Sequence, residues 1–158
     1  MVEFLHISWE ENEIICKKLA KRIKEYEPEV LVGISRGGLV PVRLFSDYLN
    51  NHNVGIMRIE FYTGINKTSK APKITQPLSI NVKGKKVLLV DDVSDTGKSL
   101  KAAIEYVKSL GAKEVRSVTL HFKPKSILKP DYYDGESDAW IIYPWEKKET
   151  KRKQWGDF

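Results

Sequence analysis

Short apolar runs alternate with amphipathic segments along this chain. Val30–Ile34 and Val87–Val90 consist almost entirely of Val, Leu and Ile, which is typical of parallel strands buried on both faces. Ile56–Phe61 and Val115–Leu120 are two further expected strands. Strands separated by helical segments predict an α/β fold, with a mostly parallel sheet flanked by helices.

Two of the expected helices have clear end signals. Ser8 and Glu11 have the spacing of a capping box at the start of a first helix. Another helix is expected to begin near Lys98 and to end at Gly111, which suits a left-handed cap. Its apolar residues fall at helical spacing, namely Leu100, Ala103, Ile104, Val107 and Leu110.

The composition is that of one domain. With 158 residues, 41% of them hydrophobic, residues 1–158 can bury a three-layer core but not a second independent module. No apolar stretch reaches membrane-spanning length and no signal-peptide pattern is present, so the expected location is cytoplasmic. The single cysteine, Cys16, excludes an internal disulfide framework.

The net charge of +6 raises the question of a nucleic-acid partner. Much of the excess lies in the basic tail, 147–158, whose lysine-rich part at 147–153 is expected to be a solvated terminus. No DNA- or RNA-binding motif accompanies it, so no nucleic-acid partner is expected. A cationic surface also favours capture of a polyanionic small molecule.

The most informative segment is VLLVDDVSDTGKS, residues 87–99. Asp91 and Asp92 follow the apolar run, and a short turn containing Asp95 leads into the next helix. A helix N-terminus at the carboxyl end of a strand offers backbone N–H groups to an anion. The amides of 96–99, the hydroxyls of Thr96 and Ser99 and the ammonium of Lys98 would suit one phosphate group, with Gly97 in the turn.

A nucleotide P-loop is the competing interpretation, because TGKS resembles its end. That motif needs a glycine five residues before Gly97, where this chain has Asp92. The pair of Asp91 and Asp92 fits better beside a polyol, since carboxylates accept hydrogen bonds from vicinal hydroxyls and can hold Mg²⁺. A ribose 5-phosphate offers these groups, while simple capping of the turn is the alternative.

A second polar segment, SRGGLVP at 35–41, follows the strand Val30–Ile34. The glycines, Gly37 among them, allow a ligand to approach the backbone. The guanidinium of Arg36 matches phosphate oxygens, and Ser35 precedes it. This is a pyrophosphate site in outline, although a plain tight turn into a helix at Val42–Leu49 would have the same pattern.

Residues 87–99 resemble the 5-phosphoribosyl 1-pyrophosphate (PRPP) signature of type I phosphoribosyltransferases. The resemblance implies that Asp91 and Asp92 bind the ribose hydroxyls and that 95–99 bind the 5′-phosphate. Asp95 would be the acid/base group that faces the nucleobase. Residues 35–37 would bind the pyrophosphate, and in that family the peptide matching Ser35–Arg36 is often cis.

The choice of base depends on Lys123, in the HFKP segment, and on Trp140 and Ile141. An indole can stack on a planar heterocycle, and a lysine can donate to an exocyclic oxygen. This arrangement resembles the xanthine-guanine and hypoxanthine-guanine branch, in which the backbone of Ile141 would face the purine 2-position. The alternatives are a core aromatic for Trp140 and a solvated surface lysine for Lys123.

The segment 62–77 is long, rich in lysine and without a pattern of its own. A loop of this length is expected to be a lid or to be disordered. In the family, a mobile loop at this place closes over the site. Lys67, Lys70 and Lys73 could then screen the pyrophosphate, or each could simply be solvated.

The predicted function is a purine salvage enzyme that transfers the phosphoribosyl group of PRPP, with Mg²⁺, to a 6-oxopurine. One alternative is a regulator of the same fold that binds nucleotides and nucleic acid. Another is an enzyme for a different base, such as adenine. The resemblance further implies a small C-terminal hood at about 123–146 and a homodimer or homotetramer.

Overall fold

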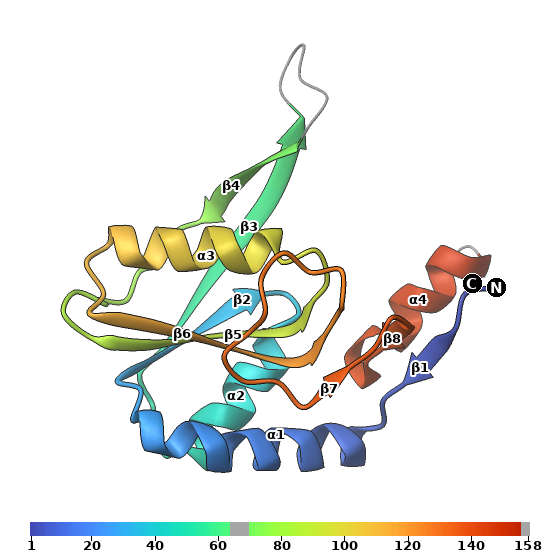
Figure 1. The fold of residues 1–158 in the computed structure, drawn as a ribbon, viewed down its shortest axis with the longest axis horizontal. Helices are drawn as coiled ribbons and strands as arrows, with labels where there is room; N and C mark the ends of the chain where they lie inside the picture. Colours follow the sequence, from blue (N-terminus) through green and yellow to red (C-terminus); the bar gives the residue numbers. More distant parts are fainter. Residues whose placement is uncertain (64–69, 156–158) are drawn as a thin grey trace.

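Six strands form the main sheet of the computed structural model, which describes residues 1–63 and 70–155 (Figure 1). The strand order is β4-β3-β2-β5-β6-β7, and every neighbouring pair is parallel except β3 and β4. The predicted mostly parallel sheet is confirmed. The strands are β2 (Val30–Ser35), β3 (Val54–Thr63), β4 (Lys70–Gln76), β5 (Lys86–Ser94), β6 (Glu114–Phe122) and β7 (Gly135–Glu136).

Helices cover both faces of this sheet. Helices α1 (Trp9–Ile23) and α2 (Leu39–Tyr48) lie on one face, and α3 (Lys98–Ser109) lies on the other (Figure 1). Successive side chains of a strand point to opposite faces, so Leu88 packs toward α1 and α2 while Leu89 packs toward α3. Both faces are therefore dry, which explains the unbroken apolar runs of the central strands.

The predicted helix ends are also present. The Ser8 hydroxyl accepts from the Glu11 amide at 3.0 Å, and the Glu11 carboxylate accepts from the Ser8 amide at 2.7 Å. Helix α3 begins at Lys98, and Gly111 has a φ of +89° just after its end. None of the helices in the described ranges is long and apolar enough to cross a membrane.

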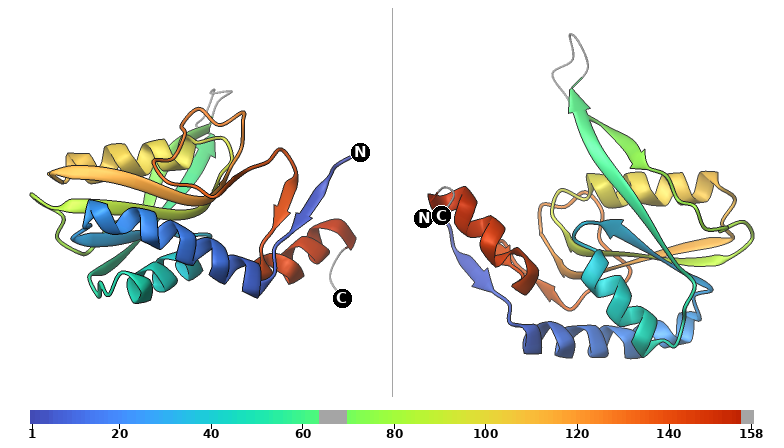
Figure 2. Two further views of the ribbon diagram at one scale, coloured as in Figure 1. Left: turned by 60° about the horizontal axis from the view of Figure 1, so that its bottom comes forward. Right: turned by 180° about the vertical axis from the view of Figure 1, so that it is seen from behind.

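A second, smaller unit joins the two ends of the described chain. Strand β1 (Phe4–His6) pairs in parallel with β8 (Trp140–Ile142), and the 3₁₀ turn η2 (Pro144–Glu146) leads into helix α4 (Lys147–Trp155). This unit lies beside the carboxyl ends of the main strands in both views of Figure 2. Residues 147–153, expected to be a solvated terminus, are largely exposed but ordered, because they form most of α4, and Glu149 and Thr150 are the two that are not fully exposed.

Part of the segment 62–77 is a strand that the sequence did not predict. Residues 70–76 form β4, which pairs with β3 in an antiparallel hairpin that projects from the sheet (Figure 1). Lys70 and Lys73 are therefore strand residues, while Lys67 lies outside the described residues. The sequence pattern concealed this strand because β4 is largely exposed and has few apolar positions.

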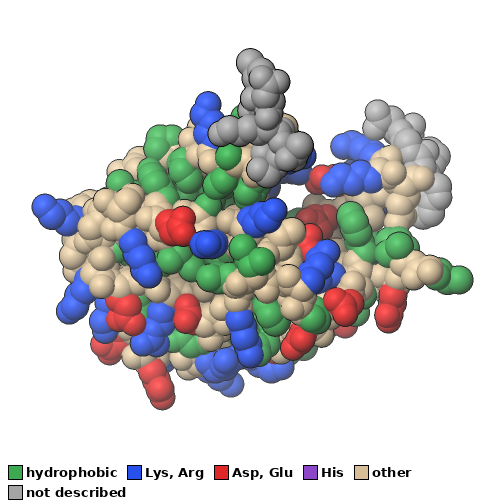
Figure 3. Space-filling model, turned by 45° about the horizontal axis from the view of Figure 1, so that its top comes forward, with side chains coloured by type: hydrophobic (Ala, Val, Ile, Leu, Met, Phe, Trp, Pro, Cys, Tyr) green, Lys and Arg blue, Asp and Glu red, His purple; other side chains and the backbone are tan. Residues whose placement is uncertain are grey.

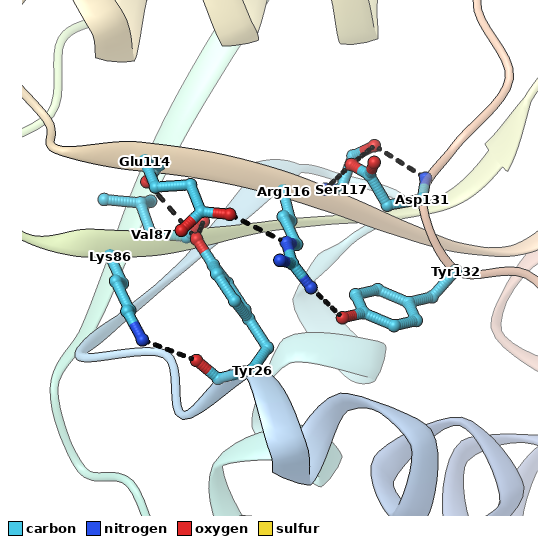
Figure 4. A network of polar contacts seen from close by, with 8 residues as sticks. All are labelled: Tyr26, Lys86, Val87, Glu114, Arg116, Ser117, Asp131 and Tyr132. Carbon is cyan, nitrogen blue, oxygen red and sulfur yellow. Dashed lines mark hydrogen bonds and ion pairs between the residues drawn. The ribbon is translucent and has the colours of Figure 1, made fainter.

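A polar network fastens the sheet at the end opposite the acidic pair (Figure 4). The buried Tyr26, in the 3₁₀ turn η1 (Lys24–Tyr26), donates from its hydroxyl to the carbonyl oxygens of Val87 at 3.1 Å and Glu114 at 3.3 Å. The Arg116 guanidinium lies 4.3 Å from the Tyr26 ring centroid and bonds to the Glu114 carboxylate and the Tyr132 hydroxyl. The network holds the start of β5 and β6 against the end of the first helix.

Replacement of Tyr26 by Phe is expected to lower the free energy of unfolding by about 1–2 kcal/mol, because a buried donor is lost while the ring remains. Urea unfolding measures the change. Tyr62→Phe removes an exposed hydroxyl and should stay within about 0.5 kcal/mol of the parent. Equal stabilities for the two variants would contradict the role of the Tyr26 hydroxyl.

Candidate active site

Asp91 and Asp92 lie within β5 rather than after it. The predicted strand ended at Val90, but pairing with β6 continues to Ser94, opposite Phe122. The Asp91 carboxylate accepts from the Asp92 amide at 2.9 Å, and the Asp92 carboxylate accepts from the Val93 amide at 2.7 Å. These backbone bonds fix both carboxyl groups in place.

Neither carboxyl group is well solvated. Burial raises the pKa of Asp91 well above its ordinary value, and the neighbouring Asp92 carboxylate raises it further. Burial also raises the pKa of Asp92, and the hydrogen bond from the Val93 amide partly offsets this rise. Two adjacent carboxylates in this environment favour ligands that supply hydroxyl donors or a cation.

The glycine-rich loop after β2 packs directly against Asp92. A Cβ atom on Gly37 would lie 2.5 Å from Asp92 Oδ1, and one on Gly38 would overlap the Val90 carbonyl oxygen. Strands β2 and β5 are neighbours, so their carboxyl ends bring the two motifs together. The Ser35–Arg36 peptide bond is cis. Segments 35–38 and 91–92, far apart in sequence, therefore form one site.

Arg36 extends from this loop toward the C-terminal helix. Its side chain is 73% exposed, and Nη2 forms an ion pair with Glu149 Oε2 of α4 at 2.8 Å. No sequence pattern predicted this partner.

The turn from β5 to α3 is held by the segment that follows β6. Gly97 has a φ of +81°, and an added Cβ would lie 2.5 Å from Ser126 Oγ and 2.8 Å from the Leu128 amide nitrogen. The Ile127 amide donates to the Thr96 carbonyl at 2.9 Å. Within the turn, the Lys98 amide donates to the Thr96 hydroxyl at 3.3 Å, so one expected phosphate donor already has a local partner.

A pocket of about 270 Å³ opens beside this turn. Its walls contain Asp92 and Asp95 together with the three predicted purine-binding residues, Lys123, Trp140 and Ile141. The volume is near the lower end of the ~300–1,000 Å³ range typical of small-molecule pockets. Larger cavities, of about 740 and 700 Å³, contain none of the predicted site residues. Figure 3 shows acidic side chains in a hollow with Lys and Arg at its rim.

The three predicted purine-binding residues differ in exposure. Lys123 is buried, and its ammonium donates to the Ala139 carbonyl, so it is not a solvated surface lysine. Burial lowers the pKa of Lys123. Trp140 is 52% exposed, which excludes the core-aromatic alternative, whereas Ile141 is buried. The indole face is thus accessible to a planar ligand.

Asp95 is exposed, and its Oδ1 atom lies 3.3 Å from Nζ of Lys125. Lys125 lies two residues beyond Lys123 and also lines the pocket. The sequence signal for it was present in the HFKPKS segment. Asp95, Lys123 and Lys125 therefore line the same small cavity.

A buried chain of hydrogen bonds contacts the backbone of Asp92, and its residues were not predicted from the sequence. The Tyr143 hydroxyl donates to the Asp92 carbonyl oxygen at 3.0 Å and lies 2.8 Å from His121 Nδ1. The Trp145 ring stacks on Tyr143 with centroids 5.0 Å apart. The buried N–H of Trp145 forms no hydrogen bond, but it lies near enough to Asp92 to lower the pKa of that carboxyl group. Burial lowers the pKa of His121, which favours its neutral form.

Four further pocket residues were also missed, all near the C-terminus. They are Glu146, Glu149, Thr150 and Lys153. Burial raises the pKa of Glu146, and the nearby Asp92 raises it further. The available signal was an isolated acid, Glu149, within an otherwise basic run.

Within residues 1–63 and 70–155, no group of three or more His, Cys, Asp or Glu side chains has the geometry of a metal site. Asp91 and Asp92 could supply two carboxylate ligands. Mg²⁺ normally keeps several waters and often takes the rest of its ligands from a phosphorylated substrate. The residues present fit a metal that enters with such a ligand.

The structure brings the acidic pair, the glycine-rich loop and the pocket of Lys123 and Trp140 together at one edge of the sheet. The model of the phosphoribosyl transferase domain family matches residues 8–150. The chain belongs to this family, which confirms the resemblance seen in the sequence. A purine phosphoribosyltransferase structure from Pyrococcus horikoshii is 38% identical, with a TM-score of 0.84, and covers 90% of this chain and 93% of that chain.

Sequence relatives extend this likeness. The xanthine-guanine phosphoribosyltransferase of Idiomarina loihiensis is 28% identical over 143 residues, covering 89% of this chain and 85% of the relative. The hypoxanthine-guanine phosphoribosyltransferase of Saccharomyces cerevisiae is 27% identical over 187 residues, with coverages of 89% and 85%. The chain thus spans most of the length of enzymes named for purine substrates.

Replacement of Asp91 by Asn is expected to stabilise the ligand-free protein at neutral pH. The raised pKa means that stability is lost as the pH rises from the ordinary value for Asp, about 4, through the folded-state pKa. Asn keeps the oxygen that accepts from the Asp92 amide. Thermal unfolding at pH 7 should show a gain of about 2–4 °C, the shift that ~1 kcal/mol produces at this size.

The same gain should vanish near pH ~3, where Asp91 is protonated in both folded and unfolded states. A gain of equal size at both pH values would show that the charge of Asp91 is not its cause.

Proposed function

We propose that this protein transfers the phosphoribosyl group of PRPP to N9 of a 6-oxopurine and releases pyrophosphate. The observation that carries the proposal is the pocket that unites Asp95, Lys123 and Trp140 beside Asp92. It joins a group that can take a proton, a donor for an exocyclic oxygen and an accessible aromatic face.

PRPP would bind across the ends of β2 and β5. Asp91 and Asp92 would accept hydrogen bonds from the ribose hydroxyls and hold Mg²⁺ together with substrate oxygens. The turn at 95–99 and the N-terminus of α3 would bind the 5′-phosphate. Residues 35–37 would bind the pyrophosphate, with the guanidinium of Arg36 as its forked donor.

The reaction breaks the bond between the anomeric carbon and the pyrophosphate oxygen and forms a bond from that carbon to N9. Negative charge gathers on the departing pyrophosphate, where Arg36, the loop amides and Mg²⁺ would stabilise it. The purine loses one proton in the reaction, and the Asp95 carboxylate would accept it.

The base would lie on the exposed face of Trp140. Lys123 would exchange its bond to the Ala139 carbonyl for one to the purine 6-oxygen, and the backbone of Ile141 would face the 2-position. Adenine carries a donor amino group at position 6, so an ammonium there disfavours it. The names of the relatives, xanthine-guanine and hypoxanthine-guanine phosphoribosyltransferase, support this choice.

The regulator alternative is not favoured, because the matched relatives are named as enzymes. The expectations of Mg²⁺ dependence, a homodimer or homotetramer and a cytoplasmic location stay predictions. Analytical ultracentrifugation tests the oligomeric state, and chelation of the metal in the activity assay tests the cofactor.

The direct test is a panel of guanine, xanthine, hypoxanthine, adenine and uracil, each with PRPP and Mg²⁺, read as pyrophosphate release. Turnover is expected with one or more of the three 6-oxopurines and not with adenine or uracil. Turnover of adenine alone would overturn the assignment of Lys123. Absence of turnover with every base would overturn the enzyme proposal.

Replacement of Asp95 by Asn is expected to lower kcat by about 10²- to 10⁴-fold, the usual contribution of general acid/base catalysis, while PRPP binding is largely kept. Steady-state kinetics and PRPP titration separate the two effects. Asp47→Asn removes an exposed carboxylate of α2 and serves as the control. An unchanged kcat for Asp95→Asn would remove this residue from the chemistry.

Replacement of Trp140 by Ala is expected to weaken purine binding by about ten-fold or more, since stacking of a base on an aromatic side chain is worth ~1–3 kcal/mol. PRPP binding should change little. Equal KM values for the base in parent and variant would reject the stacking role.

A further inference from the structure

The ion pair between Arg36 and Glu149 links two parts of the site that are far apart in the sequence. Arg36 belongs to the loop after β2, and Glu149 lies in the first turn of α4. In the ligand-free protein, the guanidinium that would bind pyrophosphate is therefore already bound by a carboxylate of the chain itself.

Glu149 uses its two oxygens for two cations. Oε2 is 2.8 Å from Arg36 Nη2, and Oε1 is 3.0 Å from Lys153 Nζ, one turn further along α4. These partners lower the pKa of Glu149, with Lys153 as the larger cause, so the carboxylate is ionised at neutral pH. If Arg36 leaves, Lys153 still holds Glu149 in place.

The pair with Arg36 has the properties of an exchangeable contact. The Arg36 side chain is 73% exposed and that of Glu149 is 38% exposed, so solvent screens the attraction. A pyrophosphate carries several negative charges and can form two parallel bonds to the same guanidinium. It can therefore displace a single, solvated carboxylate, although that displacement reduces its net affinity.

Glu149 also stays close to the ligand after such an exchange. It lines the same pocket as Asp92 and Asp95, and its charge has the same sign as that of pyrophosphate. Like charges held at short range disfavour binding. Competition for Arg36 and repulsion of the ligand act in the same direction.

From this geometry we propose that Glu149 is a positioning residue of the pyrophosphate subsite: it holds Arg36 when the subsite is empty and competes with pyrophosphate for the guanidinium. The inference is built on the proposed function. As a consequence, Glu149 lowers the affinity for pyrophosphate, so that the product dissociates and the guanidinium pairs with Glu149 again.

The test is titration of the full chain with inorganic pyrophosphate and Mg²⁺ by calorimetry. Glu149→Gln removes the charge but keeps the size and polarity of the side chain. It is expected to tighten pyrophosphate binding by about three- to ten-fold, the range expected from loss of one exposed ion pair and one like charge. The KM for PRPP should fall in parallel, and kcat should not rise.

Glu13→Gln is the matched control. Glu13 forms an ion pair with Lys17, four residues further along α1, as Glu149 does with Lys153 of α4. Both substitutions remove one carboxylate from an exposed helical pair, but only Glu149 reaches the loop after β2. Glu13→Gln should leave pyrophosphate affinity unchanged, and thermal unfolding should show similar small changes for the two variants.

A double-mutant cycle with Arg36→Gln isolates the contact. In the Arg36→Gln background, Glu149→Gln should tighten pyrophosphate binding less than it does in the parent, because competition for the guanidinium is absent and only the repulsion of like charges remains. An unchanged or weaker affinity for the single variant Glu149→Gln would overturn the inference. So would a tightening that persists in full when Arg36 is absent, since that result would reflect long-range charge alone.

The outcome for the unsubstituted chain separates this inference from the proposed function. If that chain binds pyrophosphate and turns over a purine while Glu149→Gln behaves like the parent, only the role of Glu149 fails. If it binds neither PRPP nor pyrophosphate and forms no product, the proposed function fails and the inference fails with it.

Discussion

The contact between Gly37 and the Asp92 carboxylate is the constraint on which the whole site depends. It exists because β2 and β5 are adjacent parallel strands whose carboxyl ends lie at the same edge of the sheet. A side chain at position 37 would collide with the carboxyl group, so the loop can approach only as glycine. The pocket lined by Asp92 and Asp95 and the turn into α3 both adjoin the end of β5.

This arrangement buries the carboxyl groups of Asp91 and Asp92, which is unfavourable, and nearby hydrogen bonds offset only part of the cost. The carbonyl of Asp92 accepts from Tyr143, while its carboxylate accepts from the Val93 amide. Polar contacts to the backbone hold the geometry but do not neutralise the carboxylates. A site kept in this state is ready for hydroxyl donors or a cation, which a phosphorylated sugar with its metal supplies.

The strands that carry residues 35–37 and 87–99 could be predicted from the sequence because their pattern is local. Buried parallel strands are continuous apolar runs, and the polar residues that follow them lie at the ligand edge by topology. The pocket shared by Lys123 and Trp140 was predicted by resemblance, since the two residues come from separate elements. Their roles in binding and catalysis stay predictions.

What the sequence concealed depends on contacts between distant segments. Helix α4 has no apolar stripe that would mark it, and its one acid, Glu149, is significant only through Arg36. The exposed β4 likewise has too few apolar positions to be recognised. Extension of β5 through Asp91 to Ser94 depends on pairing with β6, which no local pattern reports.

The pairing of β1 with β8 has a consequence for how the protein is made. Phe4 lies opposite Trp140, and Val2 helps to line the pocket of Lys123 and Trp140, so that wall can close only after two segments far apart in the sequence have met. Contacts between such distant segments form late and slowly. The main sheet can therefore form before this wall of the pocket is in place.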